Sequence, residues 1–110
     1  MSASARDERL ALNESIFRTA NERMKAWEER HHGERSEVYY CECSDIDCRE
    51  HVLLEAADYE QVRSEPTHFV VAVGHANGEV EEVIGRTNAY EVVEKDDRVM
   101  HVVAATDPRS

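Results

Sequence analysis

The sequence has little of what marks several common classes of protein. No apolar run approaches the roughly 20 residues of a membrane-spanning helix, and the first eight residues have no apolar core, so we expect neither a span nor a secretory signal. Only four glycines and two prolines occur in 110 residues, so few mobile loops are expected that could form a lid over an active site. There is no Ser–His–Asp pattern, no glycine-rich phosphate loop and no His-Glu-x-x-His motif. We therefore expect a cytoplasmic protein that is not an enzyme.

Positive charge is also scarce. Asp and Glu number 24 against 13 Lys and Arg, which gives a formal net charge of −11 at pH 7. A protein that neutralises nucleic-acid phosphates or an anionic membrane surface would carry the opposite sign. The balance predicts no nucleic-acid partner and no membrane partner, and it favours a protein partner with a basic surface.

The negative charge lies almost wholly in one part of the chain. Residues 1–32 hold six basic and six acidic side chains, so the remaining 7 bases and 18 acids of residues 33–110 account for the entire net charge. This division predicts an N-terminal amphipathic helix over residues 1–32 and an acidic α+β body over residues 33–110, together forming one compact domain.

Residues 7–31 are predicted to form the long helix, since they contain good helix formers and neither Gly nor Pro. Its apolar residues recur at heptad-like spacing: Leu10, Phe17, Met24, Ala20, Trp27 and, at the margin, Ile16. Three heptads are marginal for a free coiled coil, so the stripe should be covered. It either packs on the acidic body or pairs with a partner helix, including a homodimer through the N-terminal helix.

The rest of the chain alternates short apolar runs with turn signals. The run 68–73 is the best candidate for a central strand, and the tail 106–110 is expected to fray. The remaining expected elements are strands at 37–41, 52–54 and 79–84, a helix at 55–64 ended by Pro66, and a hairpin of 90–94 with 99–104. The predicted fold is α+β, with a long N-terminal helix packed on a small, mainly antiparallel sheet, one further short helix and a loop that holds the three cysteines.

The three cysteines form the sharpest motif. Cys41, Cys43 and Cys48 lie within eight residues, and their odd number without a secretory signal argues against a disulfide framework. Three thiolates and one imidazole suit a four-coordinate zinc ion, which would also stabilise a small domain with a modest core. Three ordinary cysteines, or a redox or iron–sulfur role, are the alternatives.

The spacing leaves the fourth ligand open. His51 follows Cys48 by three residues and would close the site locally on a turn. His75 follows the apolar run in the Gly74-His75 pair, where a chain reversal would return it to the cysteines.

A set of short motifs in fixed order covers nearly the whole chain. They are LNESIFRTANER at 12–23, CEC at 41–43, CRE at 48–50, YEQVR at 59–63, PTHFVV at 66–71, GH at 74–75, YEVVEK at 90–95 and DPRS at 107–110. In this order they resemble a family of small uncharacterised actinobacterial proteins. Members keep the three cysteines and the Gly-His pair, whereas the position of His51 is not usually His. The resemblance implies Cys41, Cys43, Cys48 and His75 as the ligands of a Zn²⁺ ion, and it carries no function.

Two kinds of function fit these observations. The first is a zinc-binding module for protein interaction or regulation. The second is a sensor whose thiolates release metal on oxidation or respond to metal supply. A metalloenzyme ranks third, because four protein ligands leave no position for a reactive water.

Overall fold

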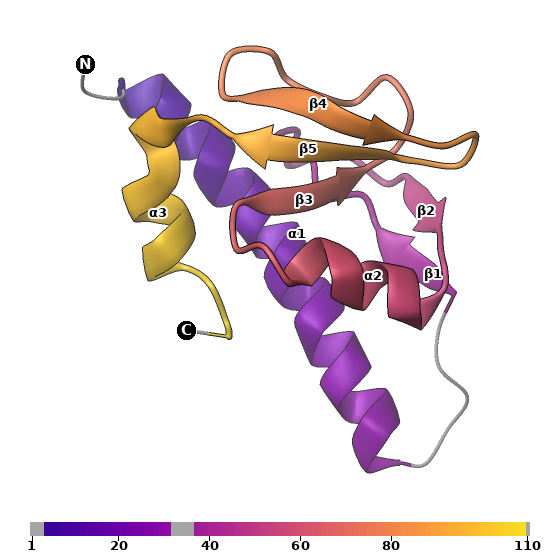
Figure 1. Cartoon of the computed structure of the whole chain (residues 1–110). Coiled ribbons are helices and arrows are strands. Elements are labelled where there is room, and N and C mark those ends of the chain that lie inside the picture. Colours follow the sequence, from indigo (N-terminus) through magenta and orange to yellow (C-terminus); the bar gives the residue numbers. More distant parts are fainter. Residues whose placement is uncertain (1–3, 32–36, 110) are drawn as a thin grey trace.

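The computed structural model describes residues 4–31 and 37–109, and its fold is the α+β arrangement that the sequence predicts (Figure 1). A long helix, α1 (Ala5–Arg30), runs behind two small antiparallel sheets. One sheet pairs β1 (Val38–Tyr40) with β2 (His51–Leu53). The other has the order β3-β5-β4. Its strands and the remaining helices are β3 (His68–Val71), β4 (Glu81–Arg86), β5 (Glu91–Lys95), α2 (Ala56–Arg63), the 3₁₀ turn η1 (Asp97–Val99) and α3 (Met100–Ala105).

The start of α1 is fixed by a reciprocal cap. The Ser4 hydroxyl accepts a hydrogen bond from the Asp7 backbone N–H, and the Asp7 carboxylate accepts one from the Ser4 backbone N–H. Two of the four N–H groups that every helix leaves free at its start are satisfied in this way. The predicted boundary between helix and body at residue 33 lies outside the described residues.

The face that α1 turns toward the body is polar, which the heptad pattern did not predict. The fully buried side chains on α1 are Ala11, Glu14, Ser15, Arg18 and Asn21. Of the predicted apolar stripe, Leu10, Phe17 and Met24 are half-buried at the margin of the contact, whereas Ile16 and Trp27 are exposed. The helix packs on the rest of the protein, as predicted, but the prediction that its apolar stripe forms the contact is wrong.

Hydrogen bonds to backbone carbonyls of other segments explain why polar residues face inward. The Arg18 guanidinium donates to the carbonyls of Pro66 (2.7 Å) and Val103 (3.0 Å) and stacks 4.3 Å above the Phe69 ring. Asn21 donates to the Tyr40 carbonyl and accepts from the Tyr40 backbone N–H. Buried polar groups are tolerated when their hydrogen bonds are made. Helix α1 is therefore held largely by specific polar contacts.

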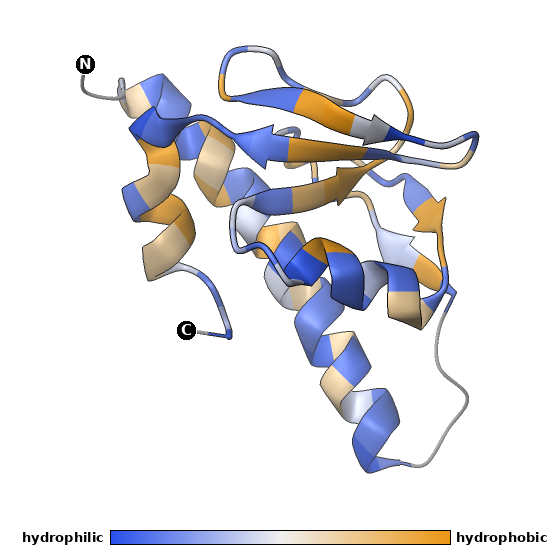
Figure 2. Ribbon diagram, in the orientation of Figure 1, coloured by the Kyte–Doolittle hydropathy of each residue, from blue (hydrophilic) through white to orange (hydrophobic). Residues whose placement is uncertain are grey.

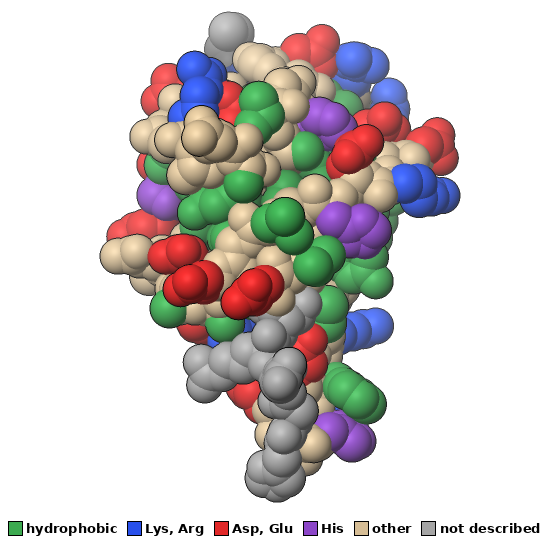
Figure 3. All heavy atoms as spheres, turned by 90° about the vertical axis from the view of Figure 1, so that its right-hand side faces the viewer, with side chains coloured by type: hydrophobic (Ala, Val, Ile, Leu, Met, Phe, Trp, Pro, Cys, Tyr) green, Lys and Arg blue, Asp and Glu red, His purple; other side chains and the backbone are tan. Residues whose placement is uncertain are grey.

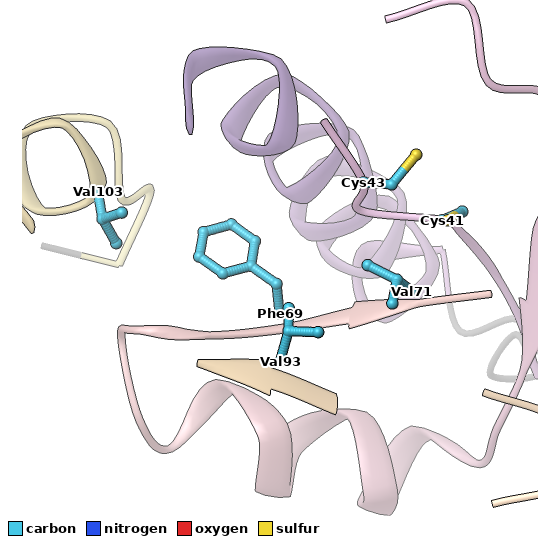
Figure 4. Packing of buried hydrophobic residues seen from close by; sticks show 6 residues of the cluster. All are labelled: Cys41, Cys43, Phe69, Val71, Val93 and Val103. Atoms are coloured by element: carbon cyan, nitrogen blue, oxygen red, sulfur yellow. The ribbon is translucent and has the colours of Figure 1, made fainter. Parts of the chain in front are cut away.

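The apolar core lies between the three-stranded sheet and the helices. Figure 2 shows hydrophobic residues in the strands of both sheets and in α3, whereas α1 is mixed along its length. One buried cluster runs from Cys41 and Cys43 through Val71, Phe69 and Val93 to Val103 on α3 (Figure 4). The central strand is β5, and β3 lies at the edge of the sheet, so the prediction of a central strand at 68–73 is wrong. The Glu42 backbone N–H covers part of that edge by donating to the Val70 carbonyl (2.8 Å).

The predicted hairpin of 90–94 with 99–104 is also wrong, because its second half is η1 and α3. The Asp96 carboxylate accepts a hydrogen bond from the Arg98 backbone N–H and begins the turn. Val99, Val102 and Val103 then recur at helical spacing and are buried. Strand β5 pairs instead with β3 and β4, so His101, which was expected inside a strand, is exposed on α3.

The C-terminal segment is held down where fraying was expected. Arg63, buried on α2, contacts the Asp107 carboxylate at 2.5 Å. Arg109 donates to the carboxylates of Glu22 and Glu60 on two different helices. These ion pairs fix residues 106–109 against α1 and α2.

Within the described ranges 4–31 and 37–109, no helix combines the length and apolar character that crossing a membrane requires.

Candidate metal centre

The predicted ligands come from two segments that are far apart in the sequence. Cys41 follows β1 directly, and Cys43 and Cys48 lie in the loop that leads to β2. His75 lies in the turn after β3. The structure nevertheless brings all four side chains together.

The spacing of the donor atoms suits one metal ion. The three Sγ atoms and a ring nitrogen of His75 all lie within 4.8 Å of one another. The Nδ1 atom of His75 is 3.6 Å from the Sγ of Cys41 and 3.6 Å from the Sγ of Cys48. A tetrahedral ion at about 2.3 Å from sulfur and about 2.05 Å from nitrogen separates the two donors by about 3.6 Å. The residues present therefore fit a closed four-coordinate site.

Cys41 is positioned by backbone hydrogen bonds on both sides. Its backbone N–H donates to the Glu50 carbonyl (3.2 Å), which closes the loop that carries the other two cysteines. Its sulfur accepts a hydrogen bond from the Ala72 backbone N–H (3.1 Å), three residues before His75. This N–H···S contact is of the kind that orients a thiolate ligand from outside the coordination sphere.

Polar contacts also fix the loop between Cys43 and Cys48. The Asp45 carbonyl accepts from the Cys48 backbone N–H (3.0 Å), which makes a tight turn. Ser44 is held from two other elements: Asn13 on α1 donates to its carbonyl (2.8 Å), and Asn77 donates to its hydroxyl (2.9 Å). The loop is thus anchored to α1 and to the turn that bears His75.

The turn that presents His75 depends on Gly74. Gly74 has a φ of +85°, a conformation that residues with a Cβ rarely adopt. Its backbone N–H donates to the carboxylate of Glu91 on β5 (2.9 Å), and the His75 backbone N–H donates to the Ala72 carbonyl (3.0 Å). The need for a positive φ explains why a glycine precedes His75: it allows the chain reversal that brings the imidazole back to the cysteines.

Glu42, between two of the cysteines, points away from them and is fully buried. The carboxylate accepts hydrogen bonds from Asn21 (2.9 Å), the Tyr59 hydroxyl (2.6 Å) and the Val70 backbone N–H (3.0 Å). Burial raises its pKa, and these three donors oppose that rise. Because alternate residues of an extended segment point to opposite sides, Cys41 and Cys43 face the site while Glu42 ties the same segment to α1, α2 and β3.

Replacing Tyr59 with phenylalanine tests this anchor. Tyr59→Phe keeps the ring that stacks on Tyr39 at 4.4 Å but removes one donor to Glu42. Hydrogen bonds to charged groups contribute about 1.5–3 kcal/mol, so we expect urea unfolding at pH 7 to show a loss in that range. Tyr40→Phe, at an exposed ring of the neighbouring strand, is the matched control and should change stability little. Equal effects of the two changes would contradict the anchor.

The thiols influence one another strongly. A hydrogen bond from the Cys41 thiol lowers the pKa of Cys43 to about 5, so Cys43 is a thiolate at neutral pH. The same hydrogen bond, together with burial, raises the pKa of Cys41. Burial also raises the pKa of Cys48. The cluster thus carries negative charge at neutral pH, which a bound cation would neutralise.

His51, the alternative fourth ligand, is not part of this group. It lies on the exposed side of β2, opposite Tyr40 in the ladder, with the two rings 5.5 Å apart. Of the other histidines, His31 stacks on Trp27 at the end of α1, and His68 lies 3.0 Å from the Glu94 carboxylate. His32 lies outside the described residues.

The sequence pointed to the four clustered residues but missed the residues that support them. Glu91 and Asn13 contact the site from elements that are distant in the chain, and no local pattern marks them. The Glu between Cys41 and Cys43 did carry a signal, because an extended Cys-x-Cys segment with both cysteines facing one way must turn its middle residue inward.

The chain matches no family model, no curated protein and no solved structure. Its function therefore has to be argued from the geometry of the site.

Proposed function

We propose that this protein binds one zinc ion through Cys41, Cys43, Cys48 and His75, and that it acts as a binding module rather than as an enzyme. The observation that carries the proposal is the convergence of three sulfurs and one imidazole nitrogen within 4.8 Å. Thiolate and imidazole donors together favour zinc over the hard cations, which prefer oxygen. Free thiols fit the reducing cytoplasm, where we expect the protein to act.

The ion would serve as a structural link between two parts of the fold. Three ligands come from the loop between β1 and β2, and the fourth comes from the turn after β3. A hydrogen bond from the Ala72 backbone N–H to the Cys41 sulfur already joins these segments, and the hydrophobic cluster that contains Cys41 and Cys43 borders the site. A metal there would join the two sheets, and four protein ligands would leave no open position for catalysis.

Burial favours this structural role over that of a redox sensor. Cys41 and Cys43 are 1% and 2% exposed, and only Cys48 is half-buried. Sensor cysteines are usually accessible to the oxidant. The arrangement therefore supports a stable site whose thiolates are shielded.

Metal stoichiometry tests the proposal. Native mass spectrometry of the freshly purified chain should show one zinc ion per chain. Cys48→Ser and His75→Ala should each lose it or bind it at least about tenfold more weakly, as expected when one of four ligands is removed.

His51→Ala is the matched control, because it removes an imidazole that lies outside the cluster. It should keep the full zinc content. Loss of zinc from His51→Ala with retention in His75→Ala would contradict the assigned ligand set. A chain without any metal, with three titratable thiols, would contradict the function itself.

A further inference from the structure

The outward face of α1 is apolar and lies opposite its buried polar face. Leu12, Ile16 and Trp27 are 43%, 55% and 54% exposed. A shallow groove of about 360 Å³ runs beside Leu12 and Ile16, and Ala20, Arg23 and Thr106 also line it. A helix that turns polar residues inward and large apolar residues outward has the pattern of a surface that docks onto something.

This stripe carries positive charge only. Positions 9, 12, 16, 20, 23, 27 and 30 follow one another at spacings of three or four, and so share one face of the helix. The charged members of that line are Arg9, Arg23 and Arg30, all exposed, with no acidic residue between them. Among the described residues, none of these arginines forms an ion pair. We call this surface the α1 stripe; it is basic and apolar on a strongly acidic protein.

A second exposed apolar surface lies on the small sheet beside the metal centre. Val38 faces Leu53 across the ladder, and Tyr40 faces His51. All four side chains are exposed on the same side, with Leu53 61% exposed. We call this surface the β1–β2 face.

Acidic residues outnumber basic ones in the segment that carries the β1–β2 face. The segment 37–55 has one exposed basic residue, Arg49, against five exposed acids: Glu37, Asp45, Asp47, Glu50 and Glu55. Figure 3 looks onto the side of the molecule where β1 and β2 lie, and there hydrophobic side chains gather between groups of Asp and Glu. This face is therefore apolar and acidic, whereas the α1 stripe is apolar and basic.

We propose that copies of this chain associate head to tail, with the α1 stripe of one copy docked on the β1–β2 face of the next. The pairing buries Leu12 and Ile16 against an apolar surface of matching size and brings arginines to carboxylates. Pairing two α1 stripes would instead place arginines against arginines, and pairing two β1–β2 faces would place acids against acids. Complementarity thus favours the heterologous contact, which can add further copies at each end.

Sedimentation velocity of the zinc-containing chain over a concentration series tests this. At low salt the average mass should rise with concentration to about twice that of one chain and beyond, as an open-ended contact allows. High salt should reduce the association, because the charge pairs are partly exposed and screened.

Two variants each remove one surface. Ile16→Asp with Arg23→Glu disrupts the α1 stripe, and Glu50→Lys with Leu53→Lys disrupts the β1–β2 face. Each variant should be a monomer alone, and their mixture should form a 1:1 dimer that grows no further, since one intact copy of each surface remains. Ile84→Asp and Glu82→Lys, at exposed positions on β4, are the matched controls and should associate like the unaltered chain.

Each other outcome overturns the proposal. A chain that stays monomeric at all concentrations has no such contact. A dimer that survives in the β1–β2 variant and is lost in the α1 variant indicates symmetric helix pairing, and the reverse result indicates pairing of the two sheet faces. Zinc content is measured on the same samples, so a failure of association is distinguished from a failure of metal binding.

Discussion

Cys41→Ser is expected to abolish zinc binding and to lower the free energy of unfolding by at least about 3 kcal/mol, since structural zinc contributes directly to folding. The side chain is both a proposed ligand and a member of the core cluster with Phe69 and Val71. Serine would remove the thiolate and place a hydroxyl in a buried apolar position. Chemical denaturation at pH 7, read by circular dichroism, measures the loss.

A chelator provides the control for this prediction. Removing zinc from the unaltered chain should reproduce most of the loss seen in Cys41→Ser, and the same chelator should have no further effect on the variant. A variant that keeps both its zinc and its stability would contradict the role of Cys41. A variant that loses zinc but not stability would show that the metal is not structural.

Lys95→Met is expected to have the second-largest effect. The Lys95 ammonium contacts the carboxylates of Glu14 and Glu81, all three side chains are fully buried, and it lies 5.0 Å from the centre of the Phe69 ring. Removing one partner of a buried charge cluster costs about 3–5 kcal/mol. Here two carboxylates would be left together without a cation. Denaturation in urea at pH 7 measures the effect.

The pH dependence of this loss has a definite sign. Burial already raises the pKa of Glu14 in the folded protein. An acid whose folded pKa is raised takes up protons on folding, so it lowers stability as pH rises from its unfolded pKa of about 4.3 toward the folded value. Lys95 opposes the rise in the pKa of Glu14, so removing it should raise that pKa further. Lys95→Met should therefore lose more stability at pH 7 than at pH 5.

Glu14→Gln is the matched control. It keeps the shape of the side chain, removes one of the two buried carboxyl groups and leaves Lys95 paired with Glu81. We expect it to change stability by less than about 1.5 kcal/mol and to weaken the pH dependence. A loss in Glu14→Gln as large as that in Lys95→Met would contradict the assignment of Lys95 as the balancing charge.

Local chemistry explains what the sequence could predict. The short strands before and after the cysteines, the helix ended by Pro66 and the grouping of Cys41, Cys43 and Cys48 follow from local composition or from a compact motif. The resemblance, rather than the spacing, favoured His75 over His51. The structure supplies the physical reason, because Gly74 turns the chain back toward the cysteines, whereas β2 holds His51 on its exposed side.

Long-range contacts explain what the sequence could not predict. The apolar spacing of α1 suggested an inward stripe, yet Arg18 and Asn21 face inward because they bond to carbonyls more than fifteen residues away. Residues 99–104 have the composition of a strand, but Asp96 caps a helical turn and the valines then pack at helical spacing. In both regions, partners distant in the chain decide which face is buried.

X-ray absorption at the zinc edge of the freshly purified protein tests the central claim most directly. The account predicts one zinc ion per chain with three sulfur neighbours at about 2.3 Å and one nitrogen at about 2.0–2.1 Å. The nitrogen contribution should disappear in His75→Ala and persist in His51→Ala. A shell with an oxygen in place of the nitrogen, with fewer than three sulfurs, or with no zinc at all would contradict it.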